Sequence, residues 1–213
     1  MQLVLASLGC LLAGGCGGQA TRRARSAAGQ PNMFAQDIES SRRAGRGPRY
    51  RPPARGLRAD HGAIVDGMSC RARLPVLSAA HVELFAYNRV VIVPAGIGVT
   101  PPLRTQGAFV RGWRCAYPLR TLDPAGLVLL GPGGPYTLGD LFDLWGQPLN
   151  RTVMAGFRAP PRQSVSVFID GQPWTGVPRR APLARHSQVT IEVGAHVRPH
   201  SSYVFPSLAW TGS

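Results

Sequence analysis

The stretch YTLGDLFDLWG, residues 136–146, contains the clearest helix pattern in the sequence. Its large apolar side chains recur at i, i+3, i+4 and i+7, on one face of a helix: Leu138, Leu141, Phe142 and Trp145. Thr137 can cap the amino end, with Asp140 at the position of a capping box. Gly146 ends the pattern, as glycine commonly does after the last helical turn. The stretch therefore predicts one short amphipathic helix.

Short apolar runs on both sides of this helix predict β-strands. They are β-branched or alternate in polarity, and they occupy residues 90–93, 127–130, 165–169 and 189–193. Asp170-Gly171 after the third run is a hairpin signal. Many short strands with one helix predict an α+β fold, a small mostly β domain with the helix packed on a sheet, and a β-grasp is one such arrangement. The apolar pattern assigns residues 61–206 to this domain and 207–213 to a C-terminal tail.

The first 16 residues have the features of an export signal. Residues 3–15 are an apolar run that is too short to span a bilayer but has the length of a signal-peptide core. The segment LAGGC, residues 12–16, resembles a bacterial lipobox, which is cut just before its cysteine. We therefore expect residues 1–15 to be a signal peptide and Cys16 to carry a lipid. An ordinary secretory signal, a buried N-terminal strand and a poorer box ending at Cys10 are the alternatives.

Residues 16–60 are expected to form a disordered basic tether that begins at the lipidated cysteine. Ten arginines lie between residues 17 and 59, opposed only by Asp37 and Glu39. Such a segment cannot bury enough apolar area to offset its ordering entropy. One lipid and a polybasic segment together attach a protein to a membrane, so the expected partners are the membrane and anionic lipid or wall polymer. Aromatic stacking residues are scarce here, and we expect no nucleic-acid partner.

The whole chain is strongly basic, and all 24 of its basic residues are arginine, with a formal net charge of +14. This charge favours anionic surroundings. A solvated basic surface and the codon bias of a GC-rich genome are equally simple explanations of the same composition.

Two cysteines remain if export removes or modifies Cys10 and Cys16. In an oxidising compartment, Cys70 and Cys115 are most simply explained as a disulfide. A metal or redox pair would need neighbouring ligands or a Cys-x-x-Cys spacing, and the sequence has neither.

Several stretches resemble a family of uncharacterised secreted bacterial proteins. They are DGMSC (66–70), VPAGIGV (93–99), CAYPL (115–119), YTLGDLFDLWGQPL (136–149) and VFIDG (167–171). The resemblance covers most of the chain from about Asp66 to Pro206 and implies no established activity. Other members of the family have His-Ala-His-Leu before the Pro-Ala-Gly-Ile-Gly segment, Leu-His-Thr-His-Asp after the second cysteine, and then Gly-x-Ile-His-Ile-Glu. That set resembles a transition-metal site.

This chain departs from the family at nearly every one of those positions. Residues 79–82 keep only His81, residues 119–123 keep only Asp123, and residues 126–131 keep neither ligand. Arg120 replaces a histidine and would place a fixed positive charge beside a bound cation. The resemblance therefore implies a divergent scaffold without metal chemistry. His81 and Asp123, with Glu83 as a substitute, are the candidate ligands of the alternative, an extracytoplasmic copper- or zinc-binding protein.

No other motif predicts catalysis. The sequence has no Gly-x-Ser-x-Gly elbow and no phosphate-binding glycine loop. Asp140 and Asp143 are better explained by the helix dipole than by a cation. His196 and His200 have a His-x3-His spacing, but Pro199 between them disfavours a helical metal site. We therefore expect no catalytic residue and no cofactor, and a non-enzymatic, lipid-anchored envelope protein.

Overall fold

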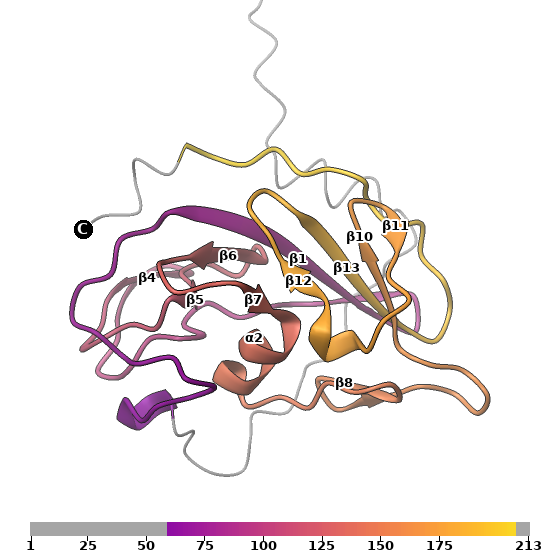
Figure 1. Ribbon diagram of the computed structural model, residues 1–213, viewed down its shortest axis with the longest axis horizontal. Coiled ribbons are helices and arrows are strands. Elements are labelled where there is room, and N and C mark those ends of the chain that lie inside the picture. The colour runs from indigo at the N-terminus through magenta and orange to yellow at the C-terminus, as the bar shows by residue number, and fades with distance from the viewer. Residues whose placement is uncertain (1–58, 208–213) are drawn as a thin grey trace, which may run out of the picture. The chain divides into compact units, whose positions relative to one another are not determined.

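A mixed seven-stranded sheet organises the computed structural model, which describes residues 59–207 (Figure 1). The predicted signal peptide, the Cys16 lipidation site, the tether up to residue 58 and residues 208–213 lie outside these residues. The strands of the sheet are β1 (Ser78–Ala86), β2 (Arg89–Val91), β5 (Leu119–Thr121), β6 (Leu127–Leu130), β10 (Ser166–Ile169), β11 (Gln172–Pro173) and β13 (Gln188–Val193).

Smaller elements surround the sheet. Three two-stranded sheets pair β3 (Arg104–Gln106) with β4 (Phe109–Gly112), β7 (Tyr136–Thr137) with β12 (Pro182–Leu183), and β8 (Val153–Met154) with β9 (Phe157–Arg158). The helical elements are η1 (Ala59–His61), α2 (Leu138–Trp145) and η2 (Pro178–Arg180). None of the helices in residues 59–207 is long and apolar enough to cross a membrane.

The order of the large sheet is β11-β10-β13-β1-β6-β5, with β2 also paired to β1. The first and last long strands, β1 and β13, are parallel neighbours, whereas β1 and β2 form an antiparallel hairpin. The order β2-β1-β13-β10-β11 is that of a β-grasp, and β6 and β5 extend the sheet beside the first half of β1. The expected α+β fold, with one main helix on a sheet, is therefore confirmed.

The helix α2 begins and ends where the sequence predicts. The Thr137 hydroxyl accepts a hydrogen bond from the Asp140 N–H at 3.3 Å, and Asp140 Oδ2 accepts one from the Thr137 N–H at 2.8 Å. These reciprocal bonds form the capping box. Gly146 follows the last turn with a φ of 68°, a left-handed conformation that glycine adopts without a steric penalty. The apolar face of α2 is buried.

One face of the sheet packs against α2. Alternate residues of the two central strands contribute to this core: Ala80, Val82, Leu84 and Ala86 from β1, and Val189, Ile191 and Val193 from β13. The opposite face is covered by a second apolar cluster and by residues 195–207, which we call the C-terminal strap. Figure 1 shows α2 and the yellow strap on opposite sides of the sheet.

Candidate functional site

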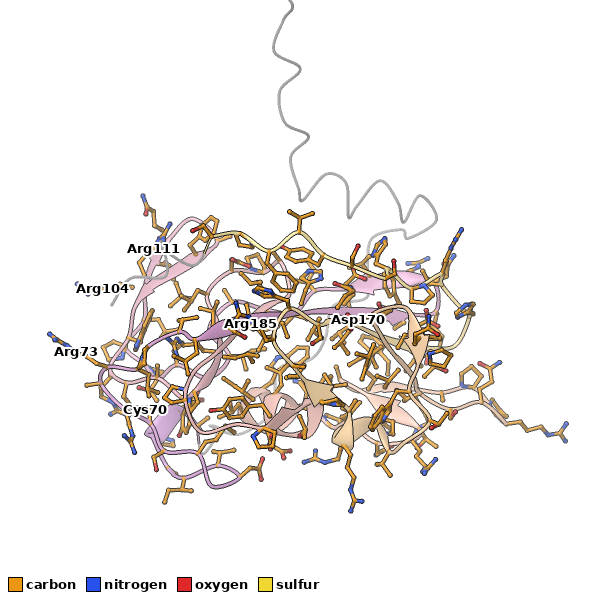
Figure 2. The ribbon with its side chains drawn as sticks, turned by 45° about the horizontal axis from the view of Figure 1, so that its top comes forward. Cys70, Arg73, Arg104, Arg111, Asp170 and Arg185 are labelled. Atoms are coloured by element: carbon orange, nitrogen blue, oxygen red, sulfur yellow. A yellow bond between two sulfur atoms is a disulfide. The ribbon has the colours of Figure 1, made fainter. Side chains whose placement is uncertain are left out.

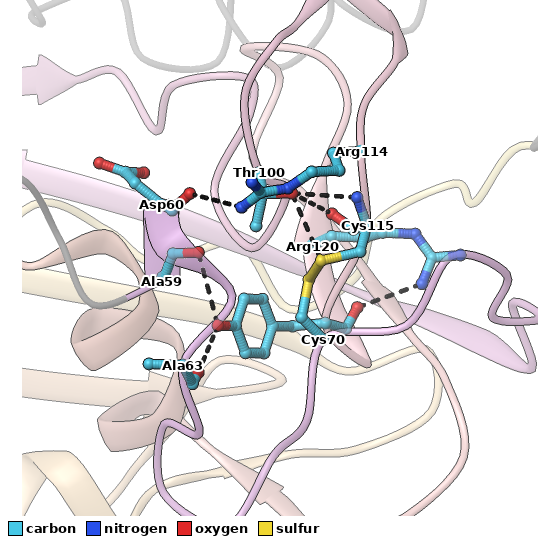
Figure 3. Close-up of a disulfide and its surroundings, with 9 residues drawn as sticks. Ala59, Asp60, Ala63, Cys70, Thr100, Arg114, Cys115 and Arg120 are labelled. Carbon is cyan, nitrogen blue, oxygen red and sulfur yellow. Dashed lines mark hydrogen bonds between the residues drawn. A yellow bond between two sulfur atoms is a disulfide. The ribbon is translucent and has the colours of Figure 1, made fainter.

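The predicted disulfide is present and closes one end of the domain (Figure 3). Cys70 and Cys115 are joined with a Cα–Cα distance of 5.5 Å. The Thr100 hydroxyl donates to the Cys115 carbonyl at 3.1 Å and accepts from the Cys115 N–H at 3.0 Å. The nearby Tyr117 hydroxyl donates to the backbone carbonyls of Ala59 and Ala63. The first described residues are therefore held against the segment between β4 and β5 that carries Cys115.

His81 lies on β1 on the strap side of the sheet and is 3% exposed. Its Nδ1 is 2.6 Å from Gln188 Oε1, and its Nε2 is 2.7 Å from the Ala125 carbonyl oxygen. A neutral imidazole has only one N–H, so it can donate to only one of these oxygens. Either His81 is protonated, or the Gln188 amide is turned so that its Nε2, which lacks a partner in the present orientation, donates to Nδ1. Tyr203 stacks on the ring with centroids 3.7 Å apart.

Asp123 is buried in the turn between β5 and β6, and its Oδ1 accepts the Ala125 N–H at 2.9 Å. Burial raises the pKa of Asp123, while this hydrogen bond and the charge of His81 lower it, and the net shift is upward. The structure therefore brings His81 and Asp123 to the same turn. Both side chains hold the backbone of Ala125. Gly126 completes the turn, because a Cβ there would lie only 2.2 Å from the Val82 carbonyl oxygen.

Two carboxylates on the same sheet face hold the C-terminal strap, the partly buried Glu83 and the buried Glu192. His200 Nδ1 lies 2.9 Å from the Glu83 carboxylate of β1. His196 Nδ1 lies 2.8 Å from Glu192 of β13, whose other oxygen accepts the Val197 N–H at 3.1 Å. Burial raises the pKa of Glu192, and the bonds from His196 and Val197 only partly oppose this. The two histidines therefore bind two different carboxylates and do not form the pair that their spacing suggests.

Arg120 is buried and forms no hydrogen bond or ion pair with His81 or Asp123 in the described part of the chain. Its guanidinium donates to the carbonyl of Leu74 at 2.9 Å and to that of Tyr117 at 3.3 Å. Its Nε has no hydrogen-bond partner in the described part of the chain, and burial lowers its pKa. Within residues 59–207, no three His, Cys, Asp or Glu side chains converge in a geometry that could hold a metal ion.

A separate acidic cluster lies beside α2. Asp143 forms a bidentate ion pair with Arg179 of η2, and Asp140 belongs to the capping box. A hydrogen bond to Asp143, partial burial and the negative charge of Asp143 raise the pKa of Asp66 to about 6. Burial alone would raise the pKa of Asp143, but hydrogen bonds from Arg179 and Asp66 outweigh it and lower that pKa. Asp140 and Asp143 therefore serve the helix and its neighbours.

An open cavity of about 250 Å³ lies at the other end of β5 and β6. Its polar lining comes from Ser69, Arg71 and Tyr136, and the remaining lining residues are glycine, proline, leucine and methionine. The Tyr136 hydroxyl already donates a hydrogen bond to the Pro132 carbonyl. His81 and Asp123 do not line this cavity, so it does not join them into one site.

The exposed charged residues of the domain are mostly arginines. Residues 59–207 contain fourteen arginines and eight acidic residues, and twelve of the arginines are exposed, compared with two of the acids. The exposed acids are Asp66, which shares a hydrogen bond with Asp143, and Asp170, which accepts the Gln188 N–H. In this part of the chain, Arg179 is the only arginine in an ion pair. The exposed charge is therefore almost entirely positive.

Comparison with protein-family models, with curated proteins and with solved structures finds no match to this chain.

Proposed function

We propose that this chain is an exported, lipid-anchored envelope protein whose domain is a non-enzymatic binding module for an anionic partner. The excess of exposed arginines over exposed acids carries this proposal. Six of the eight described carboxylates bind neighbouring backbone, histidine or Arg179. By contrast, twelve arginines are exposed without carboxylate partners among residues 59–207. Each of these guanidinium groups can contribute favourable electrostatic binding energy to an anionic partner, because no carboxylate neutralises it.

The disulfide supports the exported location, because such bonds persist in oxidising compartments. The apolar run of residues 3–15 and the box that ends at Cys16 support the anchor. A lipid chain alone gives weak, reversible membrane binding, and the ten arginines that follow Cys16 supply the second signal.

The contacts of the candidate residues support a role without catalysis. His81 and Asp123 bind the backbone of one turn, and Glu83 and Glu192 bind the strap. A general acid or base needs an atom free to reach the reacting group. The same contacts disfavour the alternative, copper or zinc binding, because both ring nitrogens of His81 already face oxygens.

Metabolic labelling with a radioactive fatty acid tests the anchor. The full chain is expressed in a bacterial host beside Cys16→Ser and, as the matched control, Cys10→Ser. We expect label and membrane association in the wild type and in Cys10→Ser, and loss of both in Cys16→Ser. Alkylation before reduction should leave Cys70 and Cys115 unmodified. An unlabelled wild-type chain that stays in the cytosol with free thiols would refute the proposal.

A further inference from the structure

We infer that one end of the domain docks on an anionic lipid bilayer. Five exposed arginines form this end, which we call the hairpin face: Arg71, Arg73, Arg104, Arg111 and Arg114. The inference deepens the proposed function, since it names the anionic partner and the surface that contacts it. It rests on that proposal only for the location of the chain beside a bilayer.

The β3–β4 hairpin presents two of these arginines in defined positions. This hairpin forms its own two-stranded sheet, and all of β3 is exposed. The Arg104 side chain lies across Gly112, where a Cβ would come within 2.4 Å of the Arg104 Nε. The Arg111 guanidinium lies 5.1 Å from the centre of the Phe109 ring. The glycine and the aromatic ring thus support the two guanidinium groups without neutralising them.

The other three arginines lie beside the disulfide. Arg71 pairs with Ala116 through reciprocal backbone hydrogen bonds, and Arg114 directly precedes Cys115. Figure 2 shows Arg73, Arg104 and Arg111 along the same end of the domain. None of the five forms an ion pair with a described residue. The covalent bridge therefore joins the two chain segments that carry the positive charge.

Exposed apolar groups on the hairpin face favour a bilayer over a soluble polymer. Pro101, Pro102 and Leu103 are exposed directly before β3, and Leu103 is 41% exposed. A hydrated anionic polymer would bind the guanidinium groups but leave these apolar groups in water. At a bilayer, guanidinium groups bind phosphates while neighbouring apolar groups enter the boundary between headgroups and acyl chains.

Because the lipid anchor keeps the domain close to the bilayer, a docking surface of low affinity is enough to hold the domain on it. Cys16 precedes Ala59 by 43 residues, so even a fully extended chain keeps the domain within about 150 Å of its anchor. Binding of the anchored domain is then intramolecular, at a high effective concentration of lipid. Each arginine near an anionic membrane strengthens binding about fivefold.

Vesicle sedimentation tests the inference on the mature chain from residue 16, with Cys16→Ser so that no acyl chain contributes. The probes are vesicles of phosphatidylglycerol and phosphatidylcholine, and vesicles of phosphatidylcholine alone. The test variant is Arg73→Gln/Arg104→Gln/Arg111→Gln. A matched variant, Arg151→Gln/Arg162→Gln/Arg180→Gln, removes the same charge from exposed positions outside the hairpin face.

We expect the test variant to lose on the order of a hundredfold in partition onto the anionic vesicles, and the matched variant to lose less than about fivefold. Equal losses, no loss in the test variant, or equal binding to the uncharged vesicles would overturn the inference. Leu103→Ser separates the two sources of phosphate. It should weaken vesicle binding and leave binding to soluble polyphosphate unchanged, and an equal effect on both would assign the face to a polymer. Fatty-acid labelling of Cys16 is independent of all these outcomes.

Discussion

Removal of the Cys70–Cys115 disulfide should lower the free energy of unfolding by about 4 kcal/mol. The bridge closes a loop with a sequence separation of 45 residues. The chain-entropy model predicts that closing a loop of that length stabilises the fold by about 4 kcal/mol at 25 °C, because the cross-link lowers the conformational entropy of the unfolded chain. The variant Cys70→Ala/Cys115→Ala keeps both positions small, so the folded domain loses little packing.

Guanidinium unfolding followed by circular dichroism measures the effect. Both proteins begin at residue 16 and carry Cys16→Ser, so that no other thiol is present. A melting temperature lower by roughly 8–16 °C is the corresponding thermal change for a chain of this size. The reduced wild type is the control, and it should unfold like the alanine pair. A loss below about 1 kcal/mol would refute the reasoning, since the loop would then be restrained without the bridge.

Four further predictions concern the helix, the acidic cluster and metal binding. Trp145→Ala should cost roughly 3–5 kcal/mol of stability, because Trp145 is 4% exposed and packs beside Phe142; a thermal melt that hardly moves would show that this helix face is not in the core. Thr137→Ala should cost about 1 kcal/mol in the same assay through loss of the N-cap, whereas Thr152→Ala, in an exposed turn, should cost less. The raised pKa of Asp66 means that the folded state holds a proton more tightly than the unfolded chain, so the free energy of unfolding should fall as pH rises from 3.8 to about 6. Asp66→Asn should remove that decline in pH-dependent unfolding, and an unchanged pH profile in this variant would contradict a raised pKa of Asp66. Calorimetry with Cu²⁺ and Zn²⁺ should detect no tight site that depends on His81, because its ring nitrogens already face Gln188 and Ala125; a stoichiometric tight site lost in His81→Ala would support the metal-binding alternative.

The helix and several strands could be predicted because their signals are local. The capping box, the apolar face and Gly146 lie within eleven residues, and the structure confirms them. The central strand β1 was not predicted. Its two faces are both buried, and His81 and Glu83 lie among its apolar residues, so it lacks the regular alternation of a strand with one solvated face. The family resemblance instead assigns His81 to the remnant of a ligand set.

The contacts of the candidate residues could be predicted only in part. The sequence singled out His81 and Asp123, and both lie at one turn. The His-x3-His spacing of His196 and His200 is one that metal sites use. In the structure, however, His200 binds Glu83, which is 117 residues earlier. Such a contact depends on the parallel pairing of β1 with β13, and no local pattern reports strand pairing across that distance. The excess of exposed arginines over exposed acids is likewise not predictable before these side chains are located in space.

The parallel pairing of β1 with β13 also determines how late in its emergence from an exit channel this domain can fold. His81 aligns with Gln188, 107 residues later, and the last six residues of the sheet belong to β13. A chain that threads through a membrane from its amino end delivers β13 last, so β1 lacks its central neighbour until almost the whole sequence has crossed. Non-local pairing of this kind is also slow to form. The topology thus delays closure of the sheet until β13 has emerged from the channel.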